Sequence, residues 1–328
     1  MTQPFRELFR YVRRYPRPFL SGIALLVVSS YFATLAPIII GNALDALRAG
    51  MAFGDIWRYL GALLGVTLAS ALAMIFVRRT MLNASWEIQF DIRHDLFAHF
   101  TRLDGAYYDN HRVGDLMARL TADLNAVRMM IGVGIYQGVN TLLVLAFTLY
   151  RMFTLNLTLA LFTLLIVPFI ALVFFVLLRI IHRRYERVQE QFSDVSAMAQ
   201  ENFNGIRVVK GFGIEDREER AFGRLNDEFI RRNLALTRVD GPLFPLMEVL
   251  FGLTLALLLL LGGRAVMVQG VFSVGEFASF VLLFMGIEWP IIAFGWIANV
   301  LQRGVTSWGR LKEIFNEAPV VRDSEWTD

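Results

Sequence analysis

The chain has 328 residues, of which 56% are hydrophobic and 19% are charged, and its mean hydropathy is +0.51. A soluble domain has about 45–50% apolar and about 25% charged residues, so this composition argues against a soluble enzyme and favours an integral membrane protein. The sequence contains no cysteine, which excludes disulfides, thiolate chemistry and cysteine-based metal sites.

Charge and histidine content narrow the class of protein further. A net charge of +3 and a pI near 9.3 are compatible with nucleic-acid binding, but the basic residues are arginines flanking apolar blocks, apart from Lys210 and Lys312. That distribution favours a membrane protein over a nucleic-acid-binding one. No metal site is expected, because the histidines lie scattered in charged stretches, at His94, His99, His111 and His182.

Residues 1–17 are polar and basic, and no small-residue cleavage site precedes the first apolar stretch. They are therefore predicted to be retained and not removed as a signal peptide. Six later stretches are long and apolar enough to cross the bilayer, which takes about 20 helical residues. These predicted spans are residues 19–41, 57–77, 131–151, 157–179, 243–263 and 274–298.

The connections between the spans differ in length and charge. Residues 42–56, 152–156 and 264–273 are short, whereas residues 78–130 and 180–242 are long and highly charged. The short side carries only Arg48, Arg58, Arg151 and Arg264, which leaves 28 of the 32 Lys and Arg on the opposite side. Because basic residues accumulate in cytoplasmic segments, we expect a multi-pass inner (plasma) membrane protein whose long connections and termini are cytoplasmic.

Both long connections are predicted to be helical hairpins. The sequence from Trp57 to about Leu103 lacks proline and predicts a continuous helix that projects roughly 39 Å beyond Val77, at about 1.5 Å per residue. It is expected to turn near residues 109–111 and Gly114 and to return over residues 116–130. The second hairpin is expected to turn near residues 211–213 and to return from about residue 218. The predicted fold class is therefore all-α, with six membrane spans and two long cytoplasmic hairpins.

Four segments carry a resemblance to a known family. They are the amphipathic residues 5–15; residues 107–123, with the pattern YYDNHRVGDLMARLTAD; residues 201–218, which begin ENFNGIRVVKGFG; and the last span, with Trp289-Pro290 followed by Ser307-Trp308-Gly309-Arg310-Leu311. In this order and spacing they resemble the exporter-type ABC transporters (type I exporter, or type IV, fold) over nearly the whole chain. The resemblance implies an elbow helix over 1–17, a transmembrane domain over 18–316 and a linker over 317–328.

The resemblance also implies that the two hairpin tips are coupling helices, which lie in grooves of nucleotide-binding domains. The implied coupling residues are Arg112, Val113, Gly114, Asp115, Leu116, Phe212, Gly213, Ile214, Glu215 and Asp216. Several side chains suit this role: Asp115 and Asp123 near helix starts would face free N–H groups, and Gly211 with Gly213 would permit a tight reversal. The alternative is a pair of solvated turns, with Phe212 folded back on its own hairpin.

The nucleotide-binding motifs themselves do not occur in the sequence. There is no G-x-x-x-x-G-K-[ST] phosphate loop and no LSGGQ-like segment, so this chain is not expected to hydrolyse ATP alone. By the resemblance, ATP and Mg²⁺ belong to a nucleotide-binding domain that is either missing or on a separate chain, and a second transmembrane half completes a homo- or heterodimer. Residues 318–323 resemble the family's linker, which favours the expectation of a truncated chain.

Two other function classes remain as alternatives at this point. One is an ATP-independent, proton-coupled permease of the same architecture, in which Glu288 and Glu248 would relay protons; the two intact coupling-loop motifs argue against it. The other is a membrane scaffold or receptor, which no motif in the sequence supports.

Polar and aromatic residues within the spans suggest a translocation path for amphipathic substrates. Carboxylates at mid-membrane are costly and tend to face a cavity or a partner, so Glu288, beside Trp289 and Pro290, is a candidate contact for cationic amphiphiles or else a structural hydrogen-bonding group. Pro290 is expected to kink the span near Gly286. Other candidates for the path are Gln137, Asn140, Trp296 and Glu248, with packing favoured for Gln137 and Asn140 and a structural role favoured for Glu248.

Overall fold

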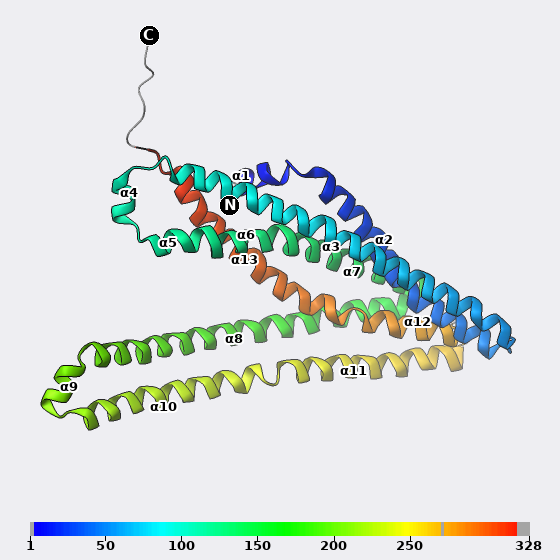
Figure 1. Cartoon of the computed structure of the whole chain (residues 1–328). Coiled ribbons are helices and arrows are strands. Elements are labelled where there is room, and N and C mark those ends of the chain that lie inside the picture. The colour runs from blue at the N-terminus through cyan, green and yellow to red at the C-terminus, as the bar shows by residue number, and fades with distance from the viewer. Residues whose placement is uncertain (1–2, 270–271, 320–328) are drawn as a thin grey trace, which may run out of the picture. The chain divides into compact units, whose positions relative to one another are not determined.

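The computed structural model describes residues 3–269 and 272–319, and none of these residues forms a β-strand. The helices follow one another in chain order from blue to red in Figure 1. The chain divides into two compact units, residues 1–160 with 262–328 and residues 161–261.

The first unit contains the helices that come before and after the second hairpin. Its N-terminal helices are α1 (Gln3–Val12), α2 (Pro16–Arg48), η1 (Phe53–Asp55), α3 (Ile56–Phe100), α4 (Gly105–Asn110), α5 (Val113–Ala118), η2 (Arg119–Asp123), α6 (Leu124–Met129), η3 (Met130–Gly134) and α7 (Ile135–Leu155). Its C-terminal helices are η4 (Ala265–Gln269), α12 (Val274–Met285) and α13 (Glu288–Asn316).

The second unit is a long helical hairpin. It is formed by α8 (Leu157–Asn204, whose first turn belongs to the first unit), α9 (Ile206–Phe212), α10 (Glu215–Asp240) and α11 (Leu243–Arg264, whose residues from Gly262 on belong to the first unit). The two arms are joined by hydrogen bonds such as Gln191 Nε2 to the Leu225 carbonyl at 3.0 Å. Gly241 and Pro242 separate α10 from α11, because proline cannot donate the backbone hydrogen bond that would continue the helix.

The six predicted membrane spans are confirmed as long apolar helices. Within the described residues, six helical stretches are long and apolar enough to cross a bilayer, and each contains one of the predicted spans. The continuous helix that was predicted from Trp57 is also confirmed, since α3 runs without interruption from Ile56 to Phe100. The predicted kink in the last span falls at Gly286 and Ile287, where α12 ends and α13 begins.

The details of the hairpin tips correct the sequence-based interpretation. The first reversal occurs at His111 and Arg112, where the backbone is extended, which agrees with the turn predicted near residues 109–111; Gly114, in contrast, lies inside α5. Gly211 lies inside α9, and only Gly213 of the predicted glycine pair has a positive φ, at 62°. Helix α9 continues to Phe212 and α10 begins at Glu215, so the second turn contains only Gly213 and Ile214. A single glycine is therefore enough to reverse the chain.

Two π-helical turns, η2 and η3, interrupt the return from the first hairpin to the membrane. They were not predicted, because hydropathy patterns do not distinguish a π-turn from an α-turn. A π-turn widens the helix locally and shifts the direction of the side chains that follow. Asp123 is the last residue of η2.

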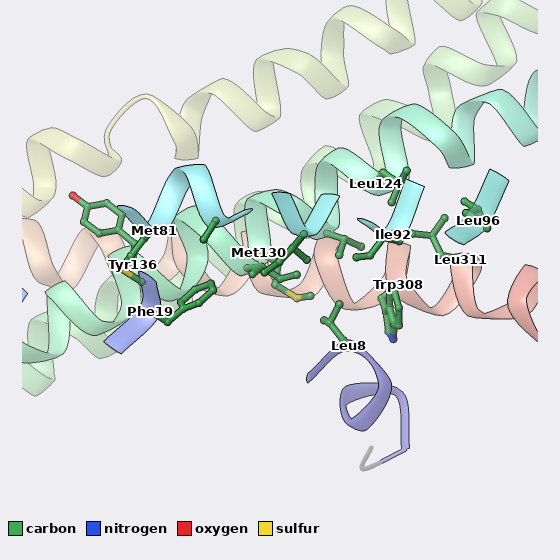
Figure 2. Packing of buried hydrophobic residues seen from close by; sticks show 14 of the residues in the cluster. Leu8, Phe19, Met81, Ile92, Leu96, Leu124, Met130, Tyr136, Trp308 and Leu311 are labelled. Atoms are coloured by element: carbon green, nitrogen blue, oxygen red, sulfur yellow. The ribbon is translucent and has the colours of Figure 1, made fainter. Parts of the chain in front are cut away.

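The buried apolar core lies in the first unit, where α1, α3, α6 and α13 meet (Figure 2). From α3, a stripe with i, i+4 spacing points into it, formed by Ile88, Ile92, Leu96 and Phe100. Figure 2 shows Ile92 and Leu96 near Leu124 of α6 and Leu311 of α13, with Trp308 and Leu8 nearby. This core holds the part of the first hairpin beyond the span against the end of α13, and it positions the site described next.

Candidate functional site

Two motifs that are 184 residues apart in the sequence meet in the first unit. Asp123, at the end of η2, accepts a hydrogen bond from Ser307 Oγ at 2.9 Å and one from Arg310 Nε at 2.9 Å. The Arg310 Nη2 group donates to the second carboxylate oxygen of Asp123 and also to Ser307 Oγ, the latter at 3.0 Å. The guanidinium therefore grips the carboxylate with two parallel donors, which gives both strength and a fixed orientation. We call Asp123, Ser307 and Arg310 the hub.

Arg119, at the start of η2, adds a second connection between the same elements. Its Nη1 donates to the Arg310 carbonyl at 2.9 Å and lies 3.6 Å from Glu313 Oε2. The Glu313 side chain is 69% exposed, so this ion pair contributes little by itself. Its effect is to attach both ends of the π-turn η2 to α13.

The electrostatics of the hub favour an ionised carboxylate. Burial of Asp123 acts to raise its pKa, but the hydrogen bonds from Arg310 and Ser307 and the charges of Arg310 and Arg119 outweigh burial and hold the pKa below its ordinary value of 3.8. The Asp123 side chain is only 10% exposed, whereas that of Arg310 is 45% exposed. Because the hub lies beyond the apolar residues 131–151 and 274–298, water reaches the arginine side of the pair.

Close packing of α13 against η3 places the hub residues of α13 beside Asp123. A Cβ atom on Gly304 would lie 2.3 Å from Cβ of Met130, so glycine is needed for α13 to approach η3 this closely. From there a buried stripe on α13 continues through Ser307, Trp308, Leu311 and Ile314. The hub is therefore held by a packed interface and not by the ion pair alone.

Helix α1, which was predicted as the elbow helix, packs against α3 and α13. Tyr11 Oη donates to Asp95 Oδ2 at 2.8 Å, and Asp91 Oδ2 accepts from Tyr15 Oη at 3.2 Å and from Arg14 Nη1 at 3.1 Å. On the α13 side, Lys312 Nζ lies 3.0 Å from Glu7 Oε1, and the Tyr11 and Trp308 rings meet edge to face. Helix α1 thus ties α3 to the part of α13 that carries the hub.

The first hairpin tip presents a short exposed helix. Arg112, Val113, Gly114 and Asp115 are exposed, with Val113 at 70%, while Leu116 is buried. Asp115 lies in the first turn of α5, as predicted. The same expectation was wrong for Asp123, which lies inside a continuous helical run and binds Arg310 instead of a free helix start.

The second tip, in the second unit, exposes Phe212. Its side chain is 79% exposed, which contradicts the alternative that it folds back on its own hairpin. Gly213 ends α9 in the left-handed conformation, and Ile214, which is half-buried, precedes Glu215 and Asp216 in the first turn of α10. The backbone N–H of Glu215 and the Lys210 ammonium, 3.0 Å from Glu215 Oε1, hold the pKa of Glu215 below its ordinary value.

The candidate path residues of the first unit lie on α7 and α13. Glu288 is half-buried at the start of α13, next to Trp289, which is 67% exposed; Trp296 is 44% exposed two turns later. Gln137 is half-buried on α7, and Asn140 Oδ1 accepts a long hydrogen bond of 3.5 Å from Ser30 Oγ of α2. This contact supports the packing interpretation of Asn140. In the second unit, Glu248 lies exposed on α11.

Sequence reasoning missed Arg119, Ser307 and Arg310 as site residues, although all three fall in motifs that it identified. The available signal was a carboxylate, Asp123, in the first motif and a Ser-x-x-Arg pair, Ser307 and Arg310, in the last one. A pairing across 184 residues was not visible without the fold.

Within the described residues, six apolar helices are long enough to cross a bilayer, and the hub joins the first hairpin to the last of them, as expected of a multi-pass membrane domain. The family model for the ABC transporter transmembrane region matches residues 19–291. The chain therefore belongs to the ABC transporter transmembrane family.

Curated relatives extend the match over almost the whole chain. The multidrug resistance-like ATP-binding protein MdlA of Escherichia coli is 29% identical over 97% of this chain and 54% of its own length. An ABC transporter ATP-binding protein of Bacillus subtilis, YknU, is 27% identical over 98% of this chain and 55% of its own length. The ATP-dependent lipid A-core flippase of Nitrosococcus oceani is 30% identical over 70% of this chain and 38% of its own length. The chain spans about half the length of the curated relatives that it matches.

Proposed function

We propose that this chain is the membrane half of an ATP-driven exporter that moves amphipathic substrates out of the cytoplasm by alternating access. The observation that carries the proposal is the hub, because it ties the first hairpin to the last membrane helix through a carboxylate that accepts two hydrogen bonds from Arg310 and one from Ser307. A force applied at the exposed tip of α5 would be transmitted along η2 to α13. A hairpin that lacked such a connection would still be continuous with its own spans, but no ion pair would join it to the last membrane helix.

The proposed motor is a pair of nucleotide-binding domains that bind ATP and Mg²⁺, either continuous with this chain or on a separate polypeptide. The names of the relatives, which include ATP-binding proteins and an ATP-dependent flippase, support this. The chain's contribution is mechanical: the exposed side chains Val113 and Phe212 supply apolar anchors for grooves in those domains. The phosphate-binding and hydrolytic chemistry belongs to the motor and not to residues of this chain.

We further propose that two six-helix halves pair and that the long connections and both termini are cytoplasmic. The arginine distribution supports this orientation. Many large apolar side chains of the spans are exposed in the single chain, including Leu64, Leu165 and Leu260 at 62%, 76% and 69%. Lipid and a second half are the two environments that would cover them.

A cysteine crosslink tests the coupling directly. The chain has no cysteine of its own, so Ile214→Cys would provide its single thiol at the second tip, to be paired with cysteines placed along the groove of the nucleotide-binding domain. We expect a crosslink whose yield changes between nucleotide-free and ATP-bound states. A matched control is Arg220→Cys, which is exposed on α10 beyond the first turn and should crosslink weakly. If position 214 forms no crosslink in either state, the proposed coupling is wrong.

The substrate path is proposed to include Glu288, Trp289 and Trp296, with Gln137 at its edge. The exposure of the two tryptophans and the half-burial of Glu288 support a lining role. An apolar aromatic wall with one carboxylate suits cationic amphiphiles, since a desolvated carboxylate pairs best with a cation. Glu248 and Asn140 are proposed as structural residues.

A further inference from the structure

In the first unit, at the end of the spans away from the first hairpin, one carboxylate joins the first membrane helix to the last. Asp45 lies in the last turn of α2, and α12 begins beside it in space although 229 residues later in the sequence. Asp45 Oδ2 accepts a hydrogen bond from Ser273 Oγ at 2.5 Å, and Oδ1 accepts one from the Gly275 backbone N–H at 2.7 Å. The side chain of one helix thus satisfies a free N–H group at the start of another.

One turn before Asp45, the backbones of α2 and α12 lie in direct contact. A Cβ atom on Gly41 would lie 2.2 Å from the Gly275 carbonyl oxygen, and one on Gly275 would lie 2.0 Å from the Gly41 carbonyl oxygen. One turn further, Ser279 Oγ donates to the Pro37 carbonyl at 3.0 Å. Residues 37, 41 and 45 therefore form one face of α2 that fits α12, and small residues are what allow such contacts between membrane helices.

The start of α12 does not need Asp45 in order to be capped. Ser273 Oγ accepts from the Glu276 N–H at 2.9 Å, and Glu276 Oε2 accepts from the Ser273 N–H at 2.8 Å, which is a complete capping box within α12. If α12 moved away from α2, the helix start would keep this box, and water would replace its contacts to Asp45. The Asp45 bonds are therefore suited to break and re-form without unwinding either helix.

Helix α12 also has a joint at its other end. It is separated by Gly286 and Ile287 from α13, which carries the hub far along its length. The last membrane stretch thus consists of two helices with a break between them. Helix α13 is bonded to the first hairpin through the hub, and α12 is bonded to α2 through Asp45.

We propose that Asp45, Ser273 and Gly275 form a latch that holds the far ends of the first and last spans together, and that each transport cycle must open it. The closed latch corresponds to the state in which the path is shut on the side away from the hairpins. Asp45 is a positioning residue: it acts on the arrangement of the helices and not on substrate. The inference rests on the proposed function, because it assumes that nucleotide drives the exchange of states.

The test replaces the two bonded side chains with cysteines, Asp45→Cys and Ser273→Cys, in the assembled transporter with a motor that carries no reactive cysteine. Disulfide formation is measured with a maleimide polymer, which adds mass to each free thiol. A chain whose two cysteines are disulfide-bonded gains no mass. We expect a high yield in the nucleotide-free state and a yield about fivefold lower after trapping with ATP, Mg²⁺ and vanadate, because opening separates the pair. The control pair, Asp55→Cys with Ser273→Cys, uses an exposed carboxylate of η1 at the same end and should give a low yield in both states.

Function provides the second measurement. Oxidation of the first pair should lower ATP hydrolysis about tenfold, and reduction should restore it, since a covalent latch stops the change of state. Without any crosslink, Asp45→Asn should raise labelling of Trp289→Cys by an impermeant maleimide from the far side about threefold or more. Asp55→Asn should leave that labelling unchanged. A purely structural role of Asp45 would lower thermal stability without changing the labelling.

The outcomes separate the latch from the proposed function. If the unmodified transporter neither hydrolyses ATP nor responds to it, the proposed function fails. If the unmodified transporter hydrolyses ATP, and the cysteine pair hydrolyses it as fast with its disulfide formed as with both thiols free, only the latch is refuted. A nucleotide-free yield no higher than that of the control pair, with both thiols reactive, also refutes it.

Discussion

The hub makes a quantitative prediction for Asp123→Asn. The substitution keeps the shape of the side chain but removes the charge that receives two donors of Arg310 and one of Ser307. Breaking a fully buried ion pair costs about 3–5 kcal/mol, but the Arg310 side chain is 45% exposed and can turn to water. The remaining cost comes from charge-assisted hydrogen bonds, at about 1.5–3 kcal/mol each before relaxation. We expect a net loss of about 2–3 kcal/mol.

The assay is the shift in thermal unfolding of the purified protein in detergent, measured with Asp123→Asn, Arg310→Gln and the double variant. The two single costs should not add, because both remove the same interaction. Asp109→Asn changes an exposed carboxylate of α4 in the same hairpin. It should change the free energy of unfolding by less than about 0.5 kcal/mol. Additive effects of the two hub variants, or an equal effect of Asp109→Asn, would refute the hub as described.

Acid provides an independent check of the same interaction. The pKa of Asp123 is lower in the folded protein than its ordinary value of 3.8, so the folded protein releases this proton more readily than the unfolded chain. The stabilising contribution is therefore complete above about pH 4 and is lost as the pH falls through the folded pKa. The difference in stability between the natural chain and Asp123→Asn should shrink below about pH 4, and a difference that is independent of pH in that range would contradict the assignment.

Three further predictions follow from individual positions. Gly275→Ala should destabilise the protein by about 1–3 kcal/mol in thermal unfolding, since its Cβ would meet a backbone carbonyl of α2; Gly61→Ala, where a Cβ meets open space, should not, and equal effects would contradict the close approach. Gly213→Ala should lower the free energy of unfolding by about 1–2 kcal/mol, because φ is 62° at this residue. Gly211→Ala lies inside α9 and should be neutral or stabilising. If Gly211→Ala were the more destabilising of the two in the same assay, the turn would be formed differently. Glu288→Gln should reduce transport of cationic dyes about tenfold and spare neutral ones, and an unchanged substrate profile in a vesicle transport assay would remove it from the proposed path.

The number and extent of the spans were predictable because a bilayer imposes a hydropathy signal of fixed length. The long helix α3 followed from the absence of proline between Trp57 and Leu103, and the break near Gly286 followed from Pro290. These features depend on local sequence alone.

The features that sequence could not supply all depend on tertiary contact. Whether Gly211 or Gly213 makes the turn is decided by where α9 ends, and hydropathy does not mark that residue. The roles of Asp123 and Asp45 depend on partners 184 or more residues away. A carboxylate near a predicted helix start suggested capping for Asp123, but Asp123 ends the π-turn η2 inside a continuous helical run, and its side chain binds Arg310 of α13 instead.

The central claim is that ATP drives this membrane domain through its hairpins. The most direct measurement reconstitutes the chain with its nucleotide-binding domains in sealed vesicles and follows a panel of lipophilic cationic dyes. We predict dye movement that requires ATP and Mg²⁺, persists when an uncoupler collapses the proton gradient, and is lost in the variant Asp123→Asn. Dye movement that proceeds without ATP and stops with the uncoupler would contradict ATP-driven export and identify a proton-coupled permease.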